Sequence, residues 1–319
     1  MKRIAIAAMI LCFGTILAAA QDWPTKLVKI VVPFAAGATP DVVARLIADD
    51  LQARLNQAFI VENRPGASGN TGTDVVAKAE PDGTTIGVSI GGPLAINTLL
   101  FPNLPYDPRK DLTLITLLVT QPSVLAVNAA LGVDDTRALI DVIKRNPGKY
   151  AFGSIGAGSL SHLAMEAIAL KSGTQLVHVP YASSPQAVTA LLRDDVQMVC
   201  LPAISIMPQL HAGAIKVLAV STAERSPLLP DIPTLKEAGI DVEADAWSGL
   251  IAPAGIPKPM TARIGQFVGE AVTTPVVRDK LAAQFMMPIP GTPAEFRARI
   301  DADIARWSPV IAAAKIKIE

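Results

Sequence analysis

Runs of β-branched residues alternate with helical periods along this chain, and the alternation begins again near the middle. In the first part, the pattern predicts strands over 27–32, 58–61 and 84–90, and helices over 39–55 and 74–79. In the second part, it predicts strands over 124–127, 150–154, 177–180, 196–201 and 215–220, and helices over 136–144 and 160–170. From residue 259 onward it predicts helices that are interrupted by Pro275, Pro288 and Pro290. Strands separated by helices pair in parallel, so we expect an α/β fold with mainly parallel sheets.

The charge balance of the 319 residues argues against a nucleic-acid-binding protein. The 28 lysines and arginines equal the 28 aspartates and glutamates in number, and no basic tract occurs in the sequence. A protein that binds phosphate backbones needs an excess of basic residues on one face. The length is sufficient for one large or two medium-sized domains.

The first twenty residues have the pattern of a secretory signal peptide. Lys2 and Arg3 precede an apolar run over 4–17, and alanines at 18–20 supply the small residues that a signal peptidase needs. A membrane anchor is the alternative interpretation, but the run is shorter than the ~20 residues that cross a bilayer. The mature protein is therefore expected to be exported and soluble. Its single cysteine, Cys200, lies in an apolar run and is expected to be a core residue.

Two strand-to-helix connections are rich in small residues, one in each part of the chain. The first is Pro33-Phe34-Ala35-Ala36-Gly37-Ala38-Thr39, and Pro40 follows in the first turn of the helix. The second is Gly153-Ser154-Ile155-Gly156-Ala157-Gly158-Ser159, and Ser159 can cap the helix that follows. Small residues let a ligand approach the backbone, and free N–H groups at helix starts bind anions. Each connection is therefore a candidate anion-binding loop, although an ordinary tight turn has the same composition.

Patterns for enzymatic, dinucleotide or metal chemistry are incomplete. Gly87-Val88-Ser89-Ile90-Gly91 matches the nucleophile elbow of hydrolases, but no oxyanion segment accompanies it and its histidine would have to be one of three mid-chain residues. The glycine order at 153–158 is the reverse of a dinucleotide fingerprint. The histidines, at positions 162, 178 and 211, do not have the spacing of metal ligands. We therefore expect no catalytic residue, no cofactor and no metal site.

Several longer segments resemble one known family throughout the mature chain. In the first part they are Ile30-Val31-Val32-Pro33-Phe34-Ala35-Ala36-Gly37, Val61-Glu62-Asn63-Arg64-Pro65-Gly66-Ala67-Ser68-Gly69-Asn70 and Pro81-Asp82-Gly83-Thr84-Thr85. Further along they are Phe152-Gly153-Ser154, Ser161-His162-Leu163, Val179-Pro180-Tyr181, Ala223-Glu224-Arg225-Ser226-Pro227, Asp231-Ile232-Pro233-Thr234 and Ser248-Gly249-Leu250-Ile251-Ala252-Pro253-Ala254-Gly255. In content and order they are similar to the Bug (TctC-type) substrate-binding proteins of tripartite tricarboxylate transporters.

This resemblance implies a type II periplasmic-binding-protein fold, in which two α/β domains are joined by two crossover segments and hold a ligand in the cleft between them. The signal peptide would cover 1–20, domain I 21–123 plus 245–319, and domain II 124–244. The implied protein is not an enzyme and carries no cofactor. It is a soluble periplasmic receptor, expected to be monomeric, that delivers an organic acid, a di- or tricarboxylate, to the membrane permease subunits.

The resemblance also implies where the ligand binds. Members of the family bind carboxylates through backbone amides, hydroxyls and ordered water rather than through Arg or Lys, and neither glycine loop of this chain contains a basic residue. In domain I the implied ligand-binding residues are Phe34, Ala36, Gly37, Ala38, Thr39, Ser68, Asn70 and Ser89. In domain II they are Ser154, Ala157, Gly158, Ser159, Tyr181, Ser183 and Ser184.

Two positions depart from the family pattern and leave the ligand open. The first loop has Gly37-Ala38, where the family usually has two glycines, and Ser183-Ser184 replaces a second glycine pair after Tyr181. The ligand class could therefore differ from that of well-known members. The alternatives are a binding protein for an aromatic carboxylate or another small solute, and a secreted serine hydrolase that uses Ser89.

Overall fold

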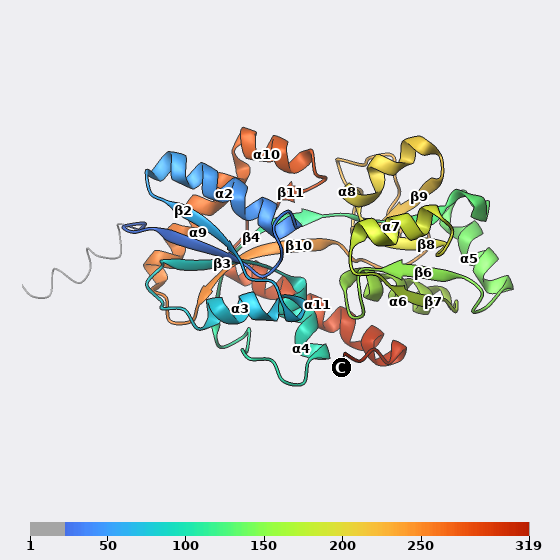
Figure 1. Ribbon diagram of the computed structural model, residues 1–319, viewed down its shortest axis with the longest axis horizontal. Helices are drawn as coiled ribbons and strands as arrows, with labels where there is room; N and C mark the ends of the chain where they lie inside the picture. The colour runs from blue at the N-terminus through green and yellow to red at the C-terminus, as the bar shows by residue number, and fades with distance from the viewer. Residues whose placement is uncertain (1–22, 319) are drawn as a thin grey trace, which may run out of the picture.

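The computed structural model describes residues 23–318, which form two lobes that each contain one mixed β-sheet (Figure 1). The predicted signal peptide lies outside the described residues. The sheet of the first lobe has the order β11-β4-β10-β3-β1-β2, and that of the second lobe has the order β7-β6-β8-β5-β9. The strands of the first lobe are β1 (Val28–Val32), β2 (Phe59–Asn63), β3 (Thr85–Ile90), β4 (Leu112–Gln121), β10 (Ala246–Pro253) and β11 (Met287–Pro288). Those of the second lobe are β5 (Ser123–Asn128), β6 (Ala151–Ser154), β7 (Val177–Pro180), β8 (Met198–Pro202) and β9 (Ile215–Val220).

Helices cover both sheets. The first lobe has α2 (Thr39–Leu55), α3 (Asn70–Ala77), α4 (Asn97–Leu100), α9 (Lys258–Thr273), α10 (Pro275–Ala282) and α11 (Pro293–Ala314). The second lobe has α5 (Thr136–Arg145), α6 (Leu160–Ser172), α7 (Ser184–Leu192) and α8 (Ala203–Ile206). Short turns of 3-10 or π helix are η1 (Ala67–Gly69), η2 (Gly92–Ile96), η3 (Ala129–Leu131) and η4 (Met207–Ala212). Within residues 23–318, none of the helices combines the length and the hydropathy that a bilayer crossing requires.

Local sequence explains the boundaries of α2, the helix that follows the first candidate loop. Pro40 stands in its first turn, where a missing N–H costs no hydrogen bond, and Asn56 ends it in the left-handed conformation with φ 50°. Val43, Ile47 and Leu51 recur at four-residue spacing and are buried in the core. The predicted limits of 39–55 are therefore confirmed.

The α/β class is also confirmed, but the strand pairing is more mixed than expected. β1 pairs in parallel with β2 and β3, and β6 with β7 and β8. In contrast, β10 is antiparallel to β3 and β4, and β5 is antiparallel to β8 and β9. The sequence did not predict β4 or β10. β4 leads into the second lobe and β10 returns from it, and neither crossing contains a helix. The rule that helix-connected strands pair in parallel therefore does not apply to them.

The two lobes are connected by short, hydrogen-bonded crossovers. β4 ends at Gln121 and β5 begins at Ser123, so only Pro122 separates the strands of the two lobes. The chain returns just before β10, where the Thr120 hydroxyl donates to the Asp245 carboxylate at 2.6 Å. This bond ties the two crossovers together on the side of the first lobe.

α11 contributes to the cores of both lobes. Near its start, Phe296 and Ile300 pack in a first-lobe cluster with residues of β4 and β10. Near its end, Trp307 and Val310 belong to the buried cluster that includes Phe152 of β6. The domain limits predicted from the sequence remain a prediction. They assign all of α11 to domain I, whereas its side chains pack in the cores of both lobes.

Trp307→Ala should destabilise the protein strongly, since Trp307 is only 1% exposed and fills the second-lobe core from a helix of the first lobe. A loss of about 3–5 kcal/mol in the free energy of unfolding is expected from the cavity. Val276→Ala is the control, because that side chain is 65% exposed and should change stability by less than about 0.5 kcal/mol. Urea denaturation measures both, and equal stability of the two variants would contradict this role of α11.

Candidate functional site

The carboxylate of Asp41 fixes the first candidate loop, residues 34–39, through hydrogen bonds. Its Oδ2 accepts the Gly37 N–H at 2.8 Å and the Arg45 Nε–H at 3.0 Å, and its Oδ1 accepts from Asn63 Nδ2 at 2.9 Å. Asn63 also donates to the Phe34 carbonyl at 3.0 Å. Gly37 adopts φ +83°, a conformation that favours glycine. The shape of this loop is therefore set by a buried carboxylate and an amide.

Hydrogen bonds keep the carboxylate of Asp41 ionised. Burial alone would raise its pKa, but hydrogen bonds from Arg45, Gly37 and Asn63 outweigh burial and hold the pKa below the ordinary value of 3.8. Asp41 is 2% exposed, and its charge is balanced by Arg45. The loop above it consequently keeps its shape throughout the neutral pH range.

The other first-lobe candidates surround a second turn. Phe34 lies against Gly69, where an added Cβ would come within 2.8 Å of the phenyl ring. Ser68 is exposed, and its carbonyl accepts from Asn97 Nδ2 at 3.1 Å. The Oδ1 of buried Asn70 accepts from Asn97 at 2.6 Å and from a tyrosine hydroxyl at 3.0 Å. The structure thus brings the loop and the turn together.

Two predicted hydroxyls of this lobe are engaged by neighbouring groups. Thr39 donates to Gln121 Oε1 at 3.2 Å, at the end of β4. The Oγ of Ser89, which is 1% exposed, lies 3.5 Å from the hydroxyl of Thr73. Neither His162 nor His178 contacts Ser89, since both belong to the second lobe. These two histidines therefore do not serve as a general base for Ser89.

The second candidate loop, residues 154–159, uses most of its polar groups internally. Ser154 Oγ lies 2.6 Å from His178 Nε2, and it accepts the Gly156 N–H at 3.2 Å. Ser159 caps α6 as predicted: its Oγ accepts the His162 N–H at 3.3 Å and donates to the Gly156 carbonyl at 2.7 Å. The hydroxyls of Ser154 and Ser159 thus form hydrogen bonds that shape the loop.

Two histidines lie behind this loop. The rings of His162 on α6 and His178 on β7 are stacked, with centroids 3.7 Å apart and planes 10° from parallel. His162 Nδ1 accepts the Gly158 N–H at 3.0 Å, and its Nε2 lies 3.5 Å from Glu166. Burial, followed by the nearby charge on His162, lowers the pKa of His178 to about 4. The His178 ring is therefore neutral at physiological pH.

The remaining second-lobe candidates have free polar groups. Tyr181 donates its N–H to the Ser154 carbonyl at 2.9 Å, which places its ring beside the loop. Ser183 is the N-cap residue of α7 but forms no side-chain cap. Within residues 23–318 we find no side-chain hydrogen bond of Tyr181, Ser183 or Ser184. These hydroxyls can therefore bind a ligand directly.

Backbone N–H groups complete the donor set. In the described part of the chain, no acceptor is found for the N–H groups of Ala36 and Thr39 in the first lobe, or of Ala157, Leu160 and Ser161 in the second. A helix start as a whole favours an anion by ~0.3–1 kcal/mol at an exposed site. Together with the free hydroxyls, they form an uncharged set of donors on both lobes.

The two halves of the site are joined by packing. At Gly158, an added Cβ would lie 2.5 Å from Leu100 of the first lobe and 2.8 Å from Ile318 of the C-terminal segment. Thr39 reaches the first crossover through its bond to Gln121. Both loops thus lie next to the junction of the lobes. Among residues 23–318, no hydrogen bond joins the candidates of one lobe to those of the other.

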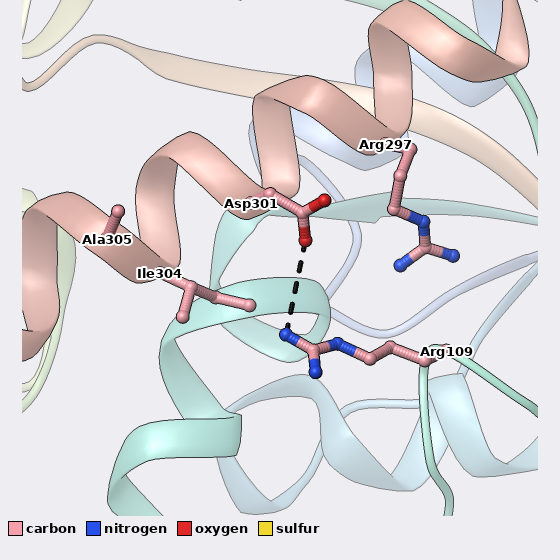
Figure 2. A pocket seen from close by; sticks show the side chains of 5 residues that line it. All are labelled: Arg109, Arg297, Asp301, Ile304 and Ala305. Atoms are coloured by element: carbon pink, nitrogen blue, oxygen red, sulfur yellow. Dashed lines mark ion pairs between the residues drawn. The ribbon is translucent and has the colours of Figure 1, made fainter.

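A cavity of about 590 Å³ lies away from these loops, where α11 faces the segment that precedes β4 (Figure 2). Arg109 and Asp301 line it and approach each other to 4.0 Å, but their side chains are 62% and 55% exposed. An ion pair this exposed contributes little. No candidate ligand-binding residue lines this surface groove.

Sequence reasoning missed the residues that shape the loops. Asn63 lies in one of the family segments but gave no sign of its contacts with the loop, and Asp41 and Gln121 were not singled out by the sequence. Cys200 was interpreted as a core residue, and this is confirmed, since it is buried in β8 and burial raises its pKa to about 12. In the described residues, no cluster of His, Cys, Asp or Glu has the arrangement of a metal site.

Two α/β lobes with small-residue loops at their junction define a two-lobed solute-binding protein. The sequence matches the family "Tripartite tricarboxylate transporter family receptor" (TctC) over residues 43–316, and the chain belongs to this family. Protein BugT of Bordetella pertussis is 33% identical over 294 residues, which cover 92% of this chain and 90% of that relative.

Solved structures of relatives agree with this fold. Rpa4515 of R. palustris with adipate is 34% identical, has a TM-score of 0.82, and the match covers 93% of this chain and 99% of that chain. MatC (Rpa3494) from Rhodopseudomonas palustris with bound malate is 30% identical, has a TM-score of 0.77, and the match covers 91% and 100% of the two chains. The type II two-domain fold expected from the sequence is therefore confirmed.

Asp41→Ala should destabilise the first lobe, because it leaves the Gly37 N–H without its acceptor and removes one of the two acceptors of the Asn63 amide. A loss of about 1–3 kcal/mol in the free energy of unfolding is expected. Since the pKa of Asp41 is lowered on folding, its contribution is present above the ordinary value of 3.8 and is lost as pH falls through the folded value. The difference from wild type should be constant between pH 8 and 5 and shrink at more acidic pH. Asp49→Ala, an exposed position on the same helix, is the matched control for denaturation.

Proposed function

We propose that this protein is a periplasmic receptor that binds an organic carboxylate, a di- or tricarboxylate, between its two lobes and delivers it to a tripartite tricarboxylate-type permease. The observation that carries this proposal is the uncharged donor set on both lobes. It offers backbone N–H groups and hydroxyls to an anion without a fixed cation, and it fits the adipate and malate that the two related structures contain.

The binding residues divide by role. In the first lobe, the N–H groups of Ala36 and Thr39 and the Ser68 hydroxyl would bind one carboxylate, while Phe34 and Ser89 would line the cleft. Gly37, Ala38 and Asn70 would act mainly through loop shape. In the second lobe, the N–H groups next to Ser159 and the hydroxyls of Tyr181, Ser183 and Ser184 would bind the remainder, with Ser154, Ala157 and Gly158 forming the loop.

Ligand capture would use movement of the lobes about the crossovers. Pro122 and the segment around Asp245 are the short connections that would absorb the rotation. The proposed domains are 21–123 plus 245–319 and 124–244, and export through the signal peptide at 1–20 would place the monomeric receptor in the periplasm. The family description supports the link to a tripartite permease.

A dicarboxylate should raise the melting temperature of the protein, whereas the matching diamide should not, because the donor set is arranged for negative oxygen atoms. Adipate, malate and benzoate are compared with their amides by differential scanning fluorimetry. A ligand that binds only the folded state stabilises by ~2.7 kcal/mol at 100 times its dissociation constant. Equal shifts with acids and amides would refute carboxylate binding, and a shift with benzoate alone would replace the proposed ligand class by aromatic acids.

Ser183→Asp should separate binding from stability. Aspartate is as good an N-cap residue as serine, so the melting temperature of the free protein should be retained. Its negative charge beside the bound carboxylate should weaken binding about tenfold or more. The control is Asp135→Ser, which exchanges the same residue types at the N-cap of α5, outside the candidate loops. Calorimetry with an unchanged affinity for Ser183→Asp would remove this helix start from the site.

A further inference from the structure

The stacked histidines behind the second-lobe loop have a defined protonation pattern. Because His162 Nδ1 accepts the Gly158 N–H, this nitrogen carries no proton, and the proton of the neutral ring lies on Nε2, toward Glu166. His178 Nε2 lies 2.6 Å from Ser154 Oγ. If His178 donates there, the Ser154 hydroxyl can donate onward to the Gly156 carbonyl at 3.1 Å.

Each ring therefore holds a different part of the loop. His162 fixes the N–H of Gly158, and His178 fixes the hydroxyl of Ser154. Phe152 stacks on His178 at 5.0 Å and is fully buried, so the rings cannot tilt independently. The N–H groups that remain free lie in the same short segment, at Ala157 and at the start of α6.

We infer that His162 is a positioning residue for the bound anion, because its Nδ1 and its stacking on His178 hold loop 154–159 in the shape that presents the free N–H groups. This inference rests on the proposed function. His162 is 5% exposed and acts through the loop, without contact to the ligand.

A proton on His162 Nδ1 would turn the acceptor into a donor that cannot pair with the Gly158 N–H, so the role of this nitrogen requires the neutral ring. The ionisable group that faces the pair from α6 is Glu166, while the contacts from β6, Phe152 and Ser154, are uncharged. Burial and the charge of His162 disfavour the cation of His178, and Glu166 favours it.

Two substitutions at His162 test the hydrogen-bond acceptor and the aromatic ring one at a time. His162→Asn keeps an acceptor oxygen near the position of Nδ1 but removes the imidazole, whereas His162→Phe keeps a stacked ring but removes the acceptor. Amide hydrogen exchange of segment 155–159 without ligand reports the loop itself. Calorimetry with adipate at pH 7.5 reports binding, and each affinity is compared with that of wild type.

His162→Phe should speed exchange in the segment and weaken adipate binding about tenfold at pH 7.5, the effect of one lost hydrogen bond to a buried donor. His162→Asn should stay within about threefold of wild type, because it keeps the acceptor of the Gly158 N–H. Wild-type exchange and affinity in His162→Phe would overturn the inference, as would equal losses of affinity in His162→Asn and His162→Phe. If wild type binds no carboxylate, the proposed function fails, and the exchange rates alone decide whether His162 positions the loop.

Discussion

The pairing of β10 with β4 is the constraint on which the rest of the structure depends. β10 lies between β4 and β3 in the sheet order, so the returning chain joins the two halves of the first-lobe sheet. α11 packs closely on it, and the Phe296 ring occupies the space that a Cβ at Gly249 would need. The first-lobe loops follow β1 and β2 of this sheet. Their position relative to the second lobe is therefore fixed by a strand that arrives from the second lobe.

A cluster of charges fixes the angle at which this strand arrives. Arg299 of α11 binds Asp245 at 2.6 Å, and Asp303 accepts from the Trp247 indole at 2.8 Å. Burial raises the pKa of Asp303 even though Arg299 and Arg306 lie beside it. Buried charges of this kind are costly to separate, so they favour one arrangement over similar alternatives. The return crossover is thus bound on one side to α11 and on the other to β4.

The sequence was informative where local patterns decide the structure. The limits of α2, the cap at Ser159 and the positions of both small-residue loops follow from periodicity and capping rules. β4 and β10 were missed because their pairing joins segments more than 120 residues apart, a contact that local patterns do not encode. The same holds for the candidate site. Its loops could be predicted from the sequence. In contrast, the internal hydrogen bonds of Ser154 and Ser159 depend on how β6, β7 and α6 pack together. The stacking of His162 on His178 depends on the same packing.

The position of Trp307 has a consequence for how the chain acquires its structure. The sheet of the second lobe is complete in sequence by residue 220, but a side chain that fills its core comes from the final helix. A chain that ends before α11 would expose the apolar surface that Trp307 and Val310 cover. The second lobe therefore cannot reach its final stability as an independent folding unit, and the native protein should unfold in one cooperative transition instead of lobe by lobe.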